Sequence, residues 1–203
     1  MDIYTSDDEK AELIKAWLKK YGLKIIVVFL LMWATAFAYE YYAEKQLEKN
    51  RFASMLYYNV LSSYSDNDNE SAETNLAKLR DGYSSTSYAW LSSLVAANKV
   101  GSLEERLELL ELVERKCAYN EIVELAKIRS ARVLWQQGSD EKAIKKLSSI
   151  SLTEFKATAD ELLGDIYFKQ GDKLKSLEYY KKSSDSVYSS PMLNAKLMDL
   201  EVV

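Results

Sequence analysis

Histidine is absent from the 203-residue chain, and cysteine, proline and glycine are scarce, with one, one and six residues respectively. The lack of histidine removes the commonest metal ligand and the commonest general base. The single cysteine, Cys117, excludes a disulfide within the chain, and its place among helix-forming residues predicts a buried structural thiol. So few glycines and prolines favour long helices and argue against a sheet protein.

A strong positive charge is also missing, because the net charge is −4. We therefore expect no nucleic-acid partner, which would need a basic field. The chain contains neither a glycine-rich phosphate loop nor a metal-binding constellation. Glu161 and Asp165 form a carboxylate pair, but such pairs are common on charged helices. We predict a protein that is not an enzyme and that uses no cofactor.

One long apolar run lies between Tyr21 and Tyr39, and Lys24 is its only charged residue. Lys24 stands close to one end, where its long side chain can reach the lipid headgroups. A helix of this length rises about 28 Å, close to the roughly 30 Å thickness of a bilayer's hydrocarbon core. The run predicts a transmembrane helix at residues 21–39, between a lead-in segment at 1–20 and a domain at 40–203.

The charges that flank this run predict its orientation. Lys19, Lys20 and Lys24 gather at its N-terminal edge, whereas the other edge begins with Glu40. Positive charge stays on the cytoplasmic side, so the lead-in is expected inside and the large domain outside. The alternative is a signal peptide cleaved after Ala38, which would release a soluble domain, although the lead-in is long and acidic for such a peptide.

The lead-in segment at 1–20 has a helical pattern of its own. Ser6 and Glu9 have the spacing of a capping box. Leu13, Trp17 and their apolar neighbours follow at helical intervals. This pattern predicts an amphipathic helix that lies on the inner membrane surface and runs into the span. A solvated lead-in is the equally weighted alternative.

Apolar residues recur at three- and four-residue spacing from residue 51 onward, without β-type alternation. In the clearest unit a small residue faces a bulky aromatic one, which lets two antiparallel helices approach closely, and a glycine supplies the turn between them. We expect the tyrosines of this unit to pack in the core rather than to bind a ligand. The unit resembles the tetratricopeptide repeat, and its positions are Leu163, Gly164, Tyr167, Gly171, Asp172, Ser176, Tyr180 and Ser183.

The same frame recurs 33 residues earlier, where Gly138 matches Gly171. A third unit spans residues 88–116 with Gly101 at its turn, and a degenerate fourth pair spans 51–64 and 70–80. The wide spacing from Gly101 to Gly138 predicts an insertion near residues 118–120. The chain is thus predicted to be all-α, with a transmembrane helix followed by a tetratricopeptide-like α-solenoid of about three to four helical hairpins.

Over nearly its full length the chain resembles the YfgM-type ancillary subunit of the SecYEG translocon. The lead-in carries this resemblance best, through Tyr4, Asp7-Asp8-Glu9, Glu12, Lys15, Trp17, Tyr21-Gly22 and Lys24. The resemblance implies a single-pass inner-membrane protein with a cytoplasmic N-terminus and a periplasmic repeat domain. It also implies that the SecYEG translocon, a PpiD-like membrane-anchored chaperone and exported polypeptides are partners, besides the lipid bilayer.

The function predicted on this basis is that of a membrane-tethered interaction module, which links the translocon to periplasmic chaperones and assists protein export and folding. Two alternatives stay open. One is a structural scaffold subunit of another envelope or secretion complex, and the other is the soluble adaptor that cleavage after Ala38 would release.

In tetratricopeptide domains the first helix of each pair lines a concave groove, so the resemblance assigns groove positions in the last two repeats. Arginine forks in such a groove suit carboxylates and peptide carbonyls. The alternative is a solvated face on which Arg132 and Asp165 pair with each other. The predicted groove residues are Arg129, Arg132, Gln136, Glu161, Asp165 and Lys169.

Overall fold

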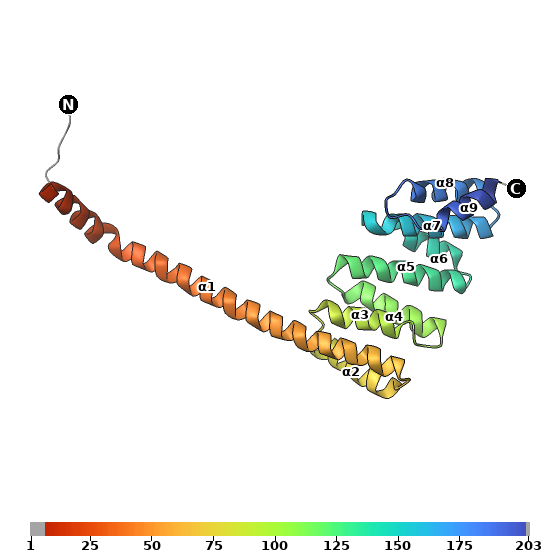
Figure 1. The fold of residues 1–203 in the computed structure, drawn as a ribbon, viewed down its shortest axis with the longest axis horizontal. Coiled ribbons are helices and arrows are strands. Elements are labelled where there is room, and N and C mark those ends of the chain that lie inside the picture. The colour runs from red at the N-terminus through yellow and green to blue at the C-terminus, as the bar shows by residue number, and fades with distance from the viewer. Residues whose placement is uncertain (1–6, 202–203) are drawn as a thin grey trace, which may run out of the picture. The chain divides into compact units, whose positions relative to one another are not determined.

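The computed structural model describes residues 7–201, and within that range it contains nine helices and no strand (Figure 1). The all-α prediction is therefore confirmed. The chain divides into two compact units, Met1–Lys49 and Asn50–Val203.

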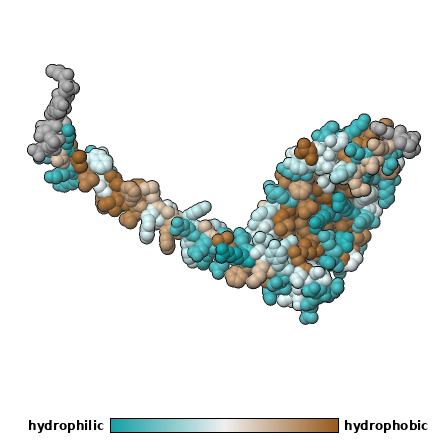
Figure 2. Space-filling model, viewed as in Figure 1, coloured by the Kyte–Doolittle hydropathy of each residue, from teal (hydrophilic) through white to brown (hydrophobic). Residues whose placement is uncertain are grey.

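The first unit is the N-terminal part of one helix, α1 (Asp7–Ser65). In the described part of the chain one helix is long and apolar enough to cross a membrane, and no residue of its most apolar window is buried. Figure 2 shows this window as a brown band with teal side chains beyond each end. The helix continues without a break through residues 20–21 and 39–40, so the predicted segment boundaries stay predictions. The capping box of Ser6 and Glu9 lies outside the side chains that the structure describes.

The second unit is a stack of helical pairs, drawn one above the next in Figure 1. The last part of α1 pairs with α2, and their shared core contains Ala53, Val60 and Leu76. This confirms the degenerate pair as a hairpin and brings the total among the described residues to four, with α9 packed against α8. The remaining helices are α2 (Asn69–Gly82), α3 (Ser87–Ala96), α4 (Leu103–Lys116), α5 (Asn120–Gln136), α6 (Asp140–Ser148), α7 (Thr153–Lys169), α8 (Lys173–Ser184) and α9 (Leu193–Glu201).

Of the predicted turn glycines, Gly101 lies in the turn between α3 and α4 without a positive φ. The other two have the left-handed conformation that favours glycine, with φ of 76° at Gly138 and 80° at Gly171. Each follows a long helix, and the next residue's N–H reaches back five positions to a helical carbonyl. Ser139 N–H donates to the Leu134 carbonyl and Asp172 N–H donates to the Tyr167 carbonyl. These bonds end α5 and α7 and reverse the chain into α6 and α8.

The close approach of α7 and α8 is built as the repeat pattern predicts. The Tyr180 ring packs directly against Gly164, where an added Cβ would overlap it. The Ser176 hydroxyl donates to the Gly164 carbonyl over 2.9 Å. Tyr180 is only 3% exposed, which confirms its core role, whereas Tyr167 is half-buried and stacks on Tyr179 with ring centroids 5.4 Å apart.

The predicted insertion near residues 118–120 is wrong. Only three residues separate the end of α4 at Lys116 from the start of α5 at Asn120. The additional length lies in α4 itself, which has 14 residues where α6 has nine. Cys117, in this short link, is half-buried rather than fully buried, and burial raises the pKa of its thiol.

Candidate binding groove

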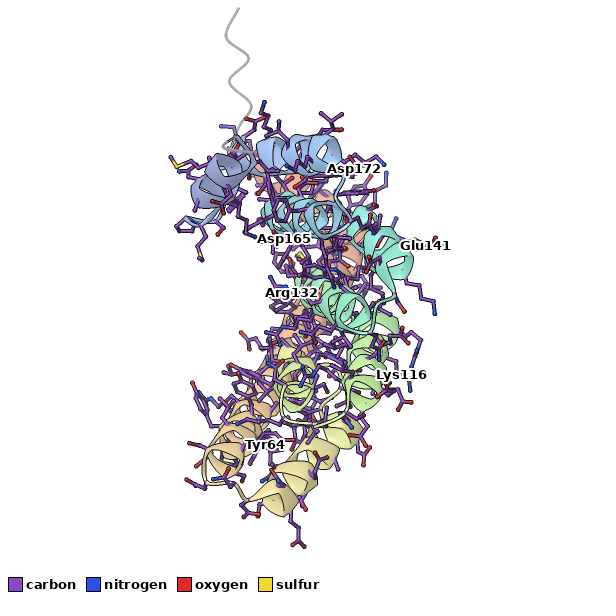
Figure 3. The ribbon with its side chains drawn as sticks, turned by 90° about the vertical axis from the view of Figure 1, so that its right-hand side faces the viewer. Tyr64, Lys116, Arg132, Glu141, Asp165 and Asp172 are labelled. Carbon is purple, nitrogen blue, oxygen red and sulfur yellow. The ribbon has the colours of Figure 1, made fainter. Side chains whose placement is uncertain are left out.

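A cavity of about 460 Å³ opens between α5, α7 and the C-terminal segment. Four of the six predicted groove residues line it, two from α5 and two from α7. Figure 3 shows Arg132 and Asp165 on one side of the stacked helices, and Lys116 and Glu141 on the other. We call this cavity the α5–α7 groove, and its lining residues are Arg132, Trp135, Gln136, Thr158, Glu161, Leu162, Asp165, Ser190 and Lys196.

Helical periodicity places these polar side chains together. Arg132 and Gln136 are four residues apart on α5, as Glu161 and Asp165 are on α7, so each pair shares one helix face. Residues on the other faces of the same helices, such as Ala131 and Leu163, are buried in the core that the two hairpins share. Burial of the apolar stripes thereby turns the charged stripes toward the groove.

The chain itself supplies a cation to the acidic wall of the groove, one ammonium for two carboxylates. The Lys196 ammonium, from α9, lies 2.7 Å from Glu161 Oε1 and 2.7 Å from Asp165 Oδ1. Burial would lower the pKa of Lys196, but its hydrogen bonds to Asp165 and Glu161 outweigh burial and raise that pKa. The Tyr180 hydroxyl also donates to Asp165 Oδ1 over 2.7 Å, and burial together with this carboxylate raises the pKa of Tyr180.

The other wall keeps its donors unused. Arg132 and Gln136 are exposed, and neither side chain has a hydrogen-bond or ion-pair partner within residues 7–201. The alternative pairing of Arg132 with Asp165 is not formed there, because Asp165 is bound to Lys196 and Tyr180 instead. The groove thus presents a guanidinium fork and a side-chain amide to solvent, beside two carboxylates that share one ammonium partner.

The two remaining predicted residues do not line the groove. Arg129 is half-buried, and its Nη1 donates to the Leu94 carbonyl over 3.0 Å, which satisfies one of the last carbonyls of α3. Burial, and then the charge of Arg132, lower the pKa of Arg129. The Lys169 ammonium lies 5.4 Å from the centroid of the Trp135 ring, a cation–π distance. Lys169 therefore contacts a groove residue without reaching the cavity.

Sequence reasoning missed five lining residues. Trp135, Thr158 and Leu162 stand one to three positions from predicted residues on the same helices, so helical neighbourhood is the signal that identifies them. Ser190 and Lys196 follow the last repeat and have no counterpart in the repeat frame, so no pattern pointed to them. Among residues 7–201 no three Asp, Glu or Cys side chains are placed to hold a metal ion.

The architecture is that of a helical-repeat protein, in which stacked antiparallel pairs present a groove built by their first helices. A family model described as "Tetratricopeptide repeat-like domain" matches residues 15–202. The chain therefore belongs to the tetratricopeptide repeat-like domain family.

Within that class, the chain is similar to proteins named "Ancillary SecYEG translocon subunit". It is 24% identical to the protein of Haemophilus influenzae, over 96% of this chain and 97% of that protein. It is 27% identical to that of Aggregatibacter actinomycetemcomitans, over 90% and 91%, and 23% identical to that of Escherichia coli K12, over the full length of both. The resemblance drawn from the lead-in and the repeats is confirmed. No solved structure matches the chain significantly.

Proposed function

We propose that the protein is a membrane-tethered, non-enzymatic interaction module ancillary to the SecYEG translocon. Residues 21–39 anchor it in the inner membrane, residues 1–20 face the cytoplasm, and residues 40–203 form a periplasmic docking domain. There it links the translocon to a PpiD-like chaperone and assists the export and folding of polypeptides. The exposed apolar helix, the repeat fold and the name shared by the relatives support this proposal.

The observation that carries the docking role is Arg132, which has no partner among the described residues and lies beside Gln136 in the α5–α7 groove. A guanidinium fork and a side-chain amide offer donors to an acceptor-rich occupant, such as the backbone carbonyls and carboxylates of a polypeptide. Since Arg132 has no partner within residues 7–201, a ligand engages it without breaking a bond inside the protein. The groove is thereby suited to a polypeptide segment of a partner.

The tether strengthens such an interaction. A partner held in the same membrane meets the groove at an effective concentration that a short linker sets at about the millimolar level. A modest intrinsic affinity at the groove is then sufficient for stable association in the membrane. A polar groove that binds only weakly can therefore still hold a partner, because the anchor and the docking domain belong to the same chain.

The direct test is site-specific photo-crosslinking from position 136 of the full chain in intact membranes. We expect crosslinks to a translocon subunit or to the membrane-anchored chaperone. The matched control carries the crosslinker at Glu141, which is exposed and lies on the other side of the helices (Figure 3), and there we expect a low yield. Arg132→Ala should lower the yield at position 136, while the unfolding free energy changes by less than about 0.5 kcal/mol.

Two results would contradict the proposal. Equal crosslinking from positions 136 and 141 would show that the groove is not the docking surface. Crosslinks from position 136 to stoichiometric subunits of another envelope complex, without translocon or chaperone subunits, would favour the scaffold function instead.

A further inference from the structure

A second cavity, of about 590 Å³, lies between the second helices of the first two hairpins, α2 and α4. It shares no lining residue with the α5–α7 groove. Leu76, Leu109 and Leu112 supply its apolar part, and Leu76 is almost fully buried, whereas the other two are half-buried. We call this cavity the α2–α4 groove.

Acidic side chains surround this apolar floor, namely Glu73, Glu105, Glu108 and Glu111. Glu111 lies 3.7 Å from Arg115, and Glu73 accepts the Tyr64 hydroxyl, which together with burial raises the pKa of Tyr64 to about 12. Glu105 and Glu108 have no ion-pair partner within residues 7–201. An apolar floor with a free acidic rim fits an occupant that has an apolar tip and basic flanks, and it repels an anionic lipid surface.

The same chain carries a segment with that chemistry. Leu174 is 83% exposed in the first turn of α8, between the exposed Lys173 and Lys175. The second helices of the hairpins also differ in charge along the repeat domain. Helices α2 and α4 together hold eight acidic and five basic side chains, whereas α6 and α8 together hold three acidic and seven basic ones.

We propose that the α2–α4 groove binds the first turn of α8 from a second copy of this chain. Leu174 of one copy covers the apolar floor of the other, and Lys173 and Lys175 face Glu105 and Glu108. Lys175 exchanges its exposed pair with Asp172, at 3.1 Å, for the new one, and surface pairs of this kind contribute little to stability. The contact joins two different surfaces, so one copy can donate its turn while its own groove receives another.

Sedimentation velocity of the full chain in detergent micelles tests this contact. We expect the wild-type chain to self-associate at low ionic strength and to dissociate progressively as salt screens the charges. Reversing the rim (E105K/E108K) or the turn (K173E/K175E) should each weaken association by at least about tenfold. Leu174→Ser should weaken it at low and high salt alike, because burial of apolar surface is not screened.

The decisive arm mixes the two charge-reversed variants. Each has one reversed surface and one intact surface, so each alone should associate at least about tenfold more weakly than the wild type. Their mixture restores surfaces of opposite charge and should associate again. The control E121K/E154K makes the same charge change at exposed positions on α5 and α7 and should associate like the wild type. Circular dichroism is used to check that every variant is folded. The proposal is overturned by a wild-type chain that stays monomeric at low salt, by rim and turn variants that associate normally, or by a mixture that stays monomeric.

Discussion

At the scale of single residues, the contact between Gly164 and Tyr180 sets how closely α7 and α8 approach. The Tyr180 ring cannot move aside easily, because it is buried and its hydroxyl is bound to Asp165. We predict that Gly164→Ala lowers the free energy of unfolding by about 1–3 kcal/mol through overpacking. Urea denaturation followed by circular dichroism in detergent measures the change.

The matched control is Gly82→Ala, at the end of α2, where an added Cβ meets no atom within 4 Å. There we expect no loss of stability, because alanine also restricts the unfolded chain. Equal losses at the two glycines would show that the α7–α8 contact is not tight.

Glu124 is a buried carboxylate that joins α5 to the segment before α7. It is 4% exposed, and its oxygens accept the Lys127 ammonium and the Ser151 N–H, each over 2.8 Å. Burial alone would raise the pKa of Glu124, but these two donors and the Leu152 N–H outweigh burial and lower it. A lowered pKa in the folded state stabilises the protein above the carboxyl's ordinary pKa, and that stability is lost as pH falls through the lowered value.

We predict that Glu124→Gln lowers the unfolding free energy at neutral pH by about 1–3 kcal/mol, because a charge-assisted network loses its charge. The difference from wild type should shrink as pH falls below the carboxyl's ordinary pKa and through its lowered folded-state pKa, because the wild-type carboxyl then becomes protonated. Urea denaturation across this pH range gives both quantities. A difference that is independent of pH would contradict the role assigned to the ionised carboxylate, and exposed Glu141→Gln serves as the control.

At the scale of helices, the repeat frame was sufficient to predict the pairs but not the C-terminal helix. The turns at Gly138 and Gly171 were predictable because a left-handed residue after an apolar periodic run has few alternatives to glycine. The spacing from Gly101 to Gly138 led to a wrong prediction of an insertion. This spacing is the sum of helix and loop lengths, so a longer α4 cannot be told from a longer loop by spacing alone. Helix α9 follows the last repeat and has no counterpart in the repeat frame, so the frame could not predict it.

The residues of the α5–α7 groove, like the helices, could be predicted only in part. Arg132, Gln136, Glu161 and Asp165 follow from helical periodicity, which places residues four apart on one face. The role of Arg129 was not predictable, because its acceptor, the Leu94 carbonyl, lies 35 residues away in sequence. Lys196 was missed because an ion pair between distant helices leaves no local pattern.

Lys196 fastens α9 to α7 through Glu161 and Asp165, and this attachment gives a prediction at the scale of that helix. We expect Lys196→Met to leave two adjacent carboxylates without their cation and to loosen α9. Amide hydrogen exchange in residues 193–201 should accelerate by about tenfold or more, while exchange in α5 stays unchanged. Asn194→Ala, at an exposed position of the same helix, is the control. Unchanged protection of α9 in the Lys196 variant would show that the ion pairs do not hold the helix.

At the scale of the whole molecule, the exposed apolar helix and the helical-repeat unit have opposite solvent requirements. Side chains such as Phe29 and Trp33 are more than half exposed, and a continuous apolar surface of this length matches the hydrocarbon core of a bilayer. The repeat unit, in contrast, buries its apolar stripes in its own cores. One chain with both parts is consistent with a domain presented at a membrane surface.

The side of the membrane on which that domain lies decides which partners it can meet. A pair of C-terminal reporter fusions measures this most directly, one reporter being active only in the periplasm and the other only in the cytoplasm. The charges at the N-terminal edge of the span predict that the periplasmic reporter is active and the cytoplasmic reporter silent, with the N-terminal segment retained in the mature protein. An active cytoplasmic reporter would contradict the proposed docking role, because the groove would then face a compartment without periplasmic chaperones.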